Sequence, residues 1–181
     1  MQKIFGITMG DSSGIGPEIL LKAWNKSEIR HPIIAYGDLS VLEFYNDRFG
    51  YGVPLAKIFS PTERREGHLN VIDAAILRRD DLTIGKVNAK SGLAAREYVV
   101  AATRAALAQQ IAAVVTLPMN KEATQLSDSG FVGHTELIGA LCGVKDVTIM
   151  LVSDQLIVTH VSTHVSPVSY THLTLPTNRE V

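Results

Sequence analysis

The sequence predicts an α/β fold, and three observations lead to it. Short apolar runs rich in β-branched residues alternate with segments of helical periodicity along the chain. A glycine loop separates the first apolar run from the first helical segment. Of the 181 residues, 46% are hydrophobic and 19% are charged, which is enough for one ordinary core. We therefore expect one domain built on a parallel sheet with flanking helices.

Six strands are expected, at residues 4–9, 32–36, 69–72, 111–117, 147–152 and 156–161, with helices between most of them. Pro17 follows the glycine loop and suits a first helical turn, where its missing N–H costs nothing, so the segment "PEILLKAWNK" is predicted to be a helix. Ser91 is predicted to cap a long second helix, "GLAAREYVVAATRAALAQ". Its alanine content indicates that this helix packs largely buried against the sheet.

Charge and signal features restrict location and partners. The 17 basic and 18 acidic side chains form no long run of either sign, so neither nucleic acid nor an anionic membrane is an expected partner. The amino terminus lacks a secretory pattern and no apolar run is long enough to span a membrane, which predicts a cytoplasmic protein. Cys142, the single cysteine, cannot form an internal disulfide and is interpreted as a small buried hydrophobe.

Two loops after predicted strands carry candidate binding residues. In "TMGDSSGIGPE", glycines allow close backbone approach before a helix N-terminus, which suits an anion; the equal alternative is a tight turn that Asp11 caps. In "TLPMNKEA", Asn120 and Lys121 follow an apolar strand at the position where open α/β sheets bind ligands. Lys121 suits an anion, or is simply a solvated lysine in a first helical turn.

Histidines form the remaining candidates. In "GHTEL", Thr135 is expected to cap a helix while His134 projects into a cleft, or is merely exposed. His160 and His164 would share a helix face, but the valines around them favour strand and loop, so at most one of the two is expected to bind a metal. The third histidine of this cluster, His172, lies in a segment of different character.

That segment, "VSYTHLTLPTNREV" at residues 168–181, has no helical period and resembles the translation of a sequencing-library adapter. We expect residues 168–181 to be a non-native tail. Residues 1–167 are then the amino-terminal part of a longer α/β fold, with the reading frame interrupted near Pro167.

Taken in order, five motifs resemble the 4-hydroxythreonine-4-phosphate dehydrogenase family of vitamin B6 (pyridoxine) biosynthesis, including its branch acting on 4-phospho-D-threonate or D-erythronate. The motifs are "ITMGDSSGIGPEI", "GKVNAKSGLAAREYV", "VVTLPMNKEA", "GHTEL" and "VTHVSTHVS". The details "PMNKEA" and "HVSTHV" are closer to the phospho-threonate branch. The chain departs from the family at Ser12 and Ser13, where relatives usually carry a proline and a small residue, and at Pro167, where a leucine is expected.

The resemblance implies roles for particular residues. His134 and Thr135 become substrate-binding residues, and His164, not His160, becomes a ligand of a divalent metal. Asp11 and Lys121 are possible anion or substrate contacts. Two further metal histidines and the residues that contact the cofactor are expected in a carboxyl-terminal half that this chain lacks.

The implied activity is NAD-dependent and divalent-metal-dependent (Zn, Mn, Co or Mg) oxidation of a phosphorylated hydroxy acid, such as 4-phosphohydroxy-L-threonine or 4-phospho-D-threonate, followed by decarboxylation. The implied fold is truncated and of the three-layer α/β/α type of the isocitrate and isopropylmalate dehydrogenases. A homodimer is implied for the full-length protein. The alternative is a catalytically inactive α/β fragment, at most a module that binds a phosphorylated ligand.

Overall fold

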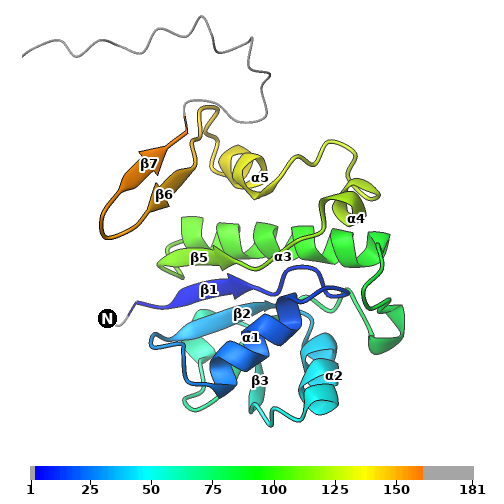
Figure 1. The fold of residues 1–181 in the computed structure, drawn as a ribbon. Helices are drawn as coiled ribbons and strands as arrows, with labels where there is room; N and C mark the ends of the chain where they lie inside the picture. The colour runs from blue at the N-terminus through cyan, green and yellow to red at the C-terminus, as the bar shows by residue number, and fades with distance from the viewer. Residues whose placement is uncertain (1–2, 161–181) are drawn as a thin grey trace, which may run out of the picture.

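The computed structural model describes residues 3–160, and a five-stranded parallel sheet lies at its centre (Figure 1). The strand order is β3-β4-β2-β1-β5. The strands are β1 (Phe5–Thr8), β2 (Ile33–Gly37), β3 (Leu55–Ile58), β4 (Leu69–Asp73) and β5 (Ala113–Thr116). Thr8, the last residue of β1, is in register with Tyr36 of β2 and Thr116 of β5. The carboxyl ends of three adjacent strands therefore lie level at one edge of the sheet.

Helices cover both faces of this sheet, which confirms the predicted three-layer α/β/α architecture (Figure 1). On one face lie α1 (Gly16–Asn25) and α2 (Leu39–Phe49), and on the other lies α3 (Ala89–Leu107). Right-handed crossovers explain this division. The connections from β1 to β2 and from β2 to β3 run one way across the sheet, whereas the connection from β4 to β5 runs the opposite way and carries α3. Two short 3₁₀ helices, η1 (Pro61–Glu63) and η2 (Arg79–Asp81), complete this part.

The core lies between the sheet and these helices. Pro17 stands in the first turn of α1, as predicted, and α1 buries Leu20 and Leu21. The alanine-rich α3 is largely buried, also as predicted, with Tyr98 and Val99 inaccessible to solvent. None of the helices within residues 3–160 is both long enough and apolar enough to cross a membrane.

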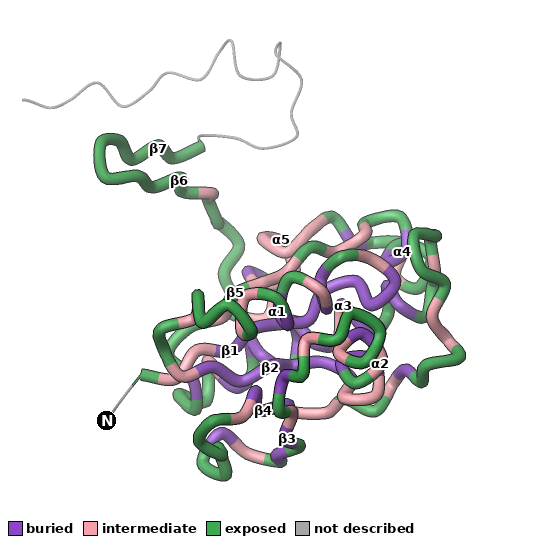
Figure 2. The backbone as a smooth tube through the Cα atoms, turned by 60° about the horizontal axis from the view of Figure 1, so that its bottom comes forward, coloured by how far each residue is buried: buried purple, intermediate pink, exposed green. Residues whose placement is uncertain are grey.

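The chain after β5 packs less tightly. It forms α4 (Lys121–Gln125), α5 (His134–Leu141) and an antiparallel hairpin of β6 (Met150–Val152) and β7 (Ile157–Thr159). The helices α4 and α5 pack against α3, while the hairpin lies apart from the parallel sheet and is exposed along its length (Figures 1 and 2). The two last predicted strands therefore exist, but within residues 3–160 they pair only with each other.

In the local structure, two sequence predictions are wrong and one strand was missed. Asn88, not Ser91, caps α3, because the Asn88 side chain accepts hydrogen bonds from the backbone N–H groups of Lys90 and Ser91. Strand β3 was not anticipated, because it is only four residues long and follows Pro54 at the edge of the sheet. Cys142, expected to be buried, is exposed where the last turn of α5 ends.

Candidate functional site

The two candidate loops meet at the carboxyl edge of the sheet. The backbone N–H of Asp11, just after β1, donates to the carbonyl oxygen of Pro118, just after β5, at 2.9 Å. Gly10 makes this approach possible, since it has a φ of +72° and a Cβ on it would lie 2.4 Å from the same carbonyl oxygen. The structure thus joins the "TMGDSSGIGPE" and "TLPMNKEA" motifs at the edge where parallel sheets bind ligands.

Asp11 caps the turn before α1. Its Oδ1 accepts from the backbone N–H of Ser13 at 2.9 Å, and its Oδ2 would lie 3.2 Å from a Cβ on Gly14. The residue is 8% exposed, and burial raises the pKa of Asp11 against the lowering effect of the Ser13 hydrogen bond. A carboxylate at this turn disfavours an anion, so the geometry suits the hydroxyl group of a ligand better than its phosphate.

Ser12 and Ser13 tie this loop to the rest of the domain. The Ser12 carbonyl oxygen accepts from the Tyr45 hydroxyl at 3.0 Å, and its Oγ lies 3.3 Å from the hydroxyl of Tyr98. Ser13 Oγ lies 2.8 Å from Ser91 Oγ. Ser91 therefore serves as a partner for the loop and is not the cap of its own helix.

Asp38 is a residue of this edge that sequence reasoning missed. It follows β2 directly and is fully buried. Its carboxylate accepts from the Tyr98 hydroxyl at 2.6 Å and from the backbone N–H groups of Ile76 and Leu77 at 2.8 and 2.9 Å. Burial raises the pKa of Asp38, and these hydrogen bonds oppose that rise. The sequence did carry a signal for Asp38, because this residue closely follows a predicted strand, as Asn120 does a few residues after another.

Lys121 is the first residue of α4, and it is held in place by its neighbour. Asn120 caps the helix, with its Oδ1 accepting from the backbone N–H of Ala123 at 3.0 Å. The lysine side chain extends toward the next helix, since a Cβ on Gly133 would lie 4.0 Å from Lys121 Nζ. Within residues 3–160 Lys121 makes no ion pair. Its positive charge is therefore available to an anionic ligand.

His134 is the first residue of α5, beside that lysine. Within the described part of the chain its Nε2 is buried and has no hydrogen-bond partner. Burial, followed by the charge of Lys121, lowers the pKa of His134, so the imidazole is largely neutral at neutral pH. The predicted cap at Thr135 is wrong, because Gly133 is the cap residue and Thr135 lies within the first turn. Within residues 3–160 no side chain caps the first N–H groups of α5, so these donors can face an anion, although Glu136 adds a negative charge to the same turn.

The predicted residues thus form two groups, not one. Lys121, His134 and Thr135 gather at the start of α5, and Asp11 lies in the loop that contacts Pro118. No hydrogen bond in residues 3–160 joins Asp11 to the other three.

The predicted metal ligand His164 lies outside the described residues. Residues 3–160 contain no group of three His, Cys, Asp or Glu side chains arranged to hold an ion. His160, whose backbone N–H donates to Ile149 at 3.1 Å, closes the β-hairpin. These residues therefore do not build a metal site by themselves.

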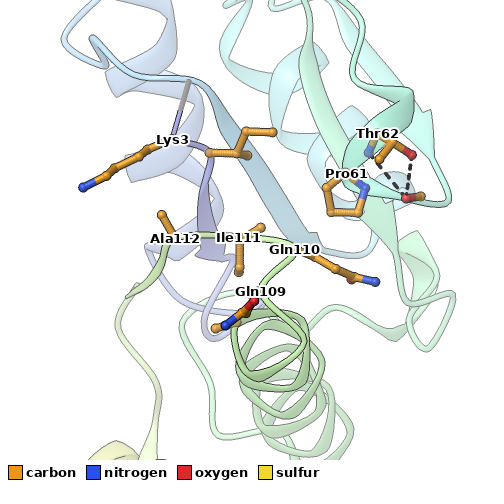
Figure 3. A pocket seen from close by; sticks show the side chains of 10 residues that line it. Lys3, Pro61, Thr62, Gln109, Gln110, Ile111 and Ala112 are labelled. Carbon is orange, nitrogen blue, oxygen red and sulfur yellow. Dashed lines mark hydrogen bonds between the residues drawn. The ribbon is translucent and has the colours of Figure 1, made fainter. Parts of the chain in front are cut away.

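A cavity of about 790 Å³ opens elsewhere, at the amino ends of β1 and β5 (Figure 3). Lys3 and Ala112 line one side of it, and Pro61 and Thr62 line the other. It lies at the sheet edge opposite the candidate loops, and none of the predicted site residues contributes to it. The carboxyl edge is therefore the place where chemistry-bearing residues gather.

Comparisons with known proteins show what the chain is similar to. The chain is 36% identical over 167 residues to a D-threonate 4-phosphate dehydrogenase of Cupriavidus necator, covering 90% of this chain and 50% of that protein. It is 38% identical over 168 residues to the D-threonate 4-phosphate dehydrogenase of Salmonella typhimurium, covering 91% and 51%. It spans about half the length of these relatives.

A solved structure of 4-hydroxythreonine-4-phosphate dehydrogenase from Klebsiella pneumoniae superposes with a TM-score of 0.84 at 33% identity, covering 94% of this chain and 53% of that one. The family model described as pyridoxal phosphate biosynthetic protein PdxA matches residues 28–172. The sequence match and the shared fold agree, and the chain belongs to the PdxA family.

Proposed function

We propose that the chain is the amino-terminal part of an NAD-dependent, divalent-metal-dependent dehydrogenase that oxidises a phosphorylated hydroxy acid and then decarboxylates it. The observation that carries this proposal is the pairing of Lys121 with His134 at the free N-terminus of α5, in a member of the PdxA family. Of the two candidate substrates, 4-phospho-D-threonate is favoured over 4-phosphohydroxy-L-threonine, because several relatives are named D-threonate 4-phosphate dehydrogenases.

In this proposal the phosphate binds at the start of α5. The free N–H groups there, together with the ammonium group of Lys121, supply the positive potential. The buried Nε2 of His134, which has no partner among residues 3–160, gains a hydrogen bond, and the Thr135 hydroxyl lies in the same turn. Anchoring one end of the substrate in this way orients its hydroxyl group before reaction.

At the other end of the substrate, Asp11 accepts a hydrogen bond from a hydroxyl group. Its carboxylate is buried and prearranged by Ser13, so it loses little freedom when the substrate binds. A divalent ion held in part by His164 would stabilise the negative charge that develops on the oxidised oxygen. Residues 3–160 do not hold that ion by themselves. In this proposal the residues that contact the cofactor lie outside the described part of the chain.

The test is NADH formation from 4-phospho-D-threonate and from 4-phosphohydroxy-L-threonine, with zinc or manganese added. This chain is compared with a full-length version that carries the uninterrupted reading frame. We expect turnover from the full-length version alone. Turnover by this chain would refute its description as part of an enzyme, and a full-length protein inactive with both substrates would refute the dehydrogenase assignment.

Lys121→Gln in the full-length protein tests the phosphate site. Loss of the anchoring charge removes binding in the ground state and the transition state alike, so KM should rise with kcat nearly unchanged. A module that only binds phosphorylated ligands would instead bind both compounds, measured by calorimetry, without producing NADH.

A further inference from the structure

We propose that Tyr98 and Asp38 are positioning residues, which hold Asp11 in place for the substrate through the hydroxyl of Ser12. The inference rests on the proposed function, because it gives Asp11 a role at the reacting end of the substrate. It concerns side chains outside the proposed phosphate site at the start of α5. The loop from Gly10 to Gly16 carries three glycines and needs such support to keep one conformation.

The direction of the hydrogen bonds is fixed by Asp38. In its ionised form this carboxylate can only accept, so the Tyr98 hydroxyl donates its single proton to Asp38 at 2.6 Å. The Tyr98 oxygen is then left as an acceptor, and Ser12 Oγ, 3.3 Å away, must be the donor. All three side chains are fully buried. One ordered chain of hydrogen bonds therefore runs from the end of β2 to the residue after Asp11.

Ser12 is held from both faces of the sheet. Tyr98 belongs to α3 on one face, and Tyr45, which donates to the Ser12 carbonyl oxygen at 3.0 Å, belongs to α2 on the other. The following residue, Ser13, is held by two backbone N–H groups. Its Oγ accepts from Thr83 at 3.2 Å, and its carbonyl oxygen accepts from Gly85 at 2.8 Å. Asp11 lies between this fixed pair and β1, so its position follows from theirs.

Stability alone does not account for the arrangement. A fully buried carboxylate with no cationic partner among residues 3–160 is costly, and apolar replacements of buried charged groups are often neutral or stabilising. The same domain tolerates Tyr36 with its hydroxyl buried and without a partner in the described residues. A satisfied network beside a catalytic edge is instead what fixes one geometry.

The experiment compares Tyr98→Phe, Ser12→Ala and their double variant in the full-length protein, with Tyr36→Phe as the matched control. Tyr36→Phe also removes one buried tyrosine hydroxyl, but one that bonds to nothing in the described residues. We expect Tyr98→Phe to lower kcat by about 10-fold to 100-fold, because small displacements of a reacting group are costly. KM should change by less than about threefold, since the phosphate site is untouched.

Ser12→Ala should lower kcat similarly, and the double variant should lose no more than either single one, because both changes break the same chain. In all variants, hydrogen exchange at the amides of Ser13, Thr83 and Gly85 is measured. Exchange should accelerate in Tyr98→Phe and Ser12→Ala and stay unchanged in Tyr36→Phe.

Losses in kcat that multiply in the double variant, or an unchanged kcat in Tyr98→Phe, would overturn the positioning role. If the unmodified full-length protein turns over neither substrate, the proposed function fails. Hydrogen exchange then still tests whether Tyr98 holds the loop that carries Asp11. Unaltered exchange at those three amides in Tyr98→Phe would then refute it.

Discussion

Lys121, the first residue of α4, lies beside His134, the first residue of α5, and Gly133 stands next to both. A side chain at Gly133 would approach Glu136 Oε2 at 3.0 Å and Lys121 Nζ at 4.0 Å. The ammonium group of Lys121 and the carboxylate of Glu136 therefore both lie beside Gly133. The pair has an electrostatic consequence, because the charge of Lys121 contributes to the lowered pKa of His134.

The first prediction concerns the titration of His134. Burial is the larger cause and Lys121 the smaller cause of the lowered pKa of this histidine. Removing the charge in Lys121→Gln should therefore move the pKa of His134 upward, but not fully to its ordinary value, because burial remains. The measurement is an NMR titration of the imidazole resonances, and Lys22→Gln on the exposed side of α1 is the control.

The sign for stability follows from the same shift. A histidine with a lowered pKa binds its proton more weakly in the folded chain than in the unfolded chain. Its neutral form is therefore favourable above the unfolded-state pKa, and stability falls as the pH drops toward the folded-state pKa. In Lys121→Gln this loss on acidification should be smaller than in the unmodified chain. A titration that does not move in Lys121→Gln would contradict the proximity of the two charges.

A second prediction concerns the contact that holds α4 on α3. A Cβ on Gly92 would lie 2.2 Å from the backbone carbonyl of Ala123, so the two helices can meet only without a side chain there. Gly92→Ala should destabilise the domain by about 1–3 kcal/mol through overpacking. Helix propensity alone predicts the opposite sign, a gain of about 1 kcal/mol.

Urea denaturation decides between these signs. A displaced α4 would also move Lys121, which is its first residue. A stabilised Gly92→Ala variant would show that α4 does not pack where the structure places it.

A third prediction tests which residue caps α3. Asn88→Ala should cost about 1 kcal/mol and speed hydrogen exchange at the amides of Lys90 and Ser91, which lose their acceptor. Asn88→Asp keeps an acceptor and should restore protection. Ser91→Ala instead removes the partner of Ser13 Oγ and should leave those two amides protected. Loss of protection at the amides of Leu93 and Ala94 in Ser91→Ala, with Lys90 and Ser91 still protected in Asn88→Ala, would reinstate the cap inferred from the sequence.

The sequence predicted the sheet and the carboxyl edge because both depend on local signals. Apolar runs identified β1, β2, β4 and β5, and the glycine loop and the "GHTEL" motif placed candidate residues at the starts of helices. It could not predict that Asn88 would replace Ser91 as a cap, because the role of Ser91 depends on Ser13, a residue far away in the chain. Tyr98 was missed for the same reason, since its pairing with Asp38 spans two elements that only the fold brings together, whereas the place of Asp38 at the end of β2 was visible in the sequence.

The antiparallel pairing of β6 with β7 could not be predicted from the sequence either. Both segments read as strands, yet nothing local distinguishes a strand that joins the parallel sheet from one that forms a separate hairpin. The exposed apolar side chains of the hairpin, such as Leu151 and Ile157, explain why periodicity was uninformative there, because both faces are apolar.

The last prediction separates the two histidines that follow β7. His160 closes the hairpin through its backbone, with its N–H donating to Ile149 and its carbonyl oxygen accepting from the Thr148 hydroxyl, so its imidazole is not needed for that role. His164, beyond the described residues, is the proposed metal ligand, and removing an imidazole ligand weakens metal binding directly. In the full-length protein, His164→Ala should abolish metal-dependent turnover, whereas His160→Ala should retain bound metal at nearly the unmodified level. Metal content by mass spectrometry after dialysis, measured beside NADH formation, checks both variants. Equal loss of metal from the two variants would show that the ligand was assigned to the wrong histidine or that both bind.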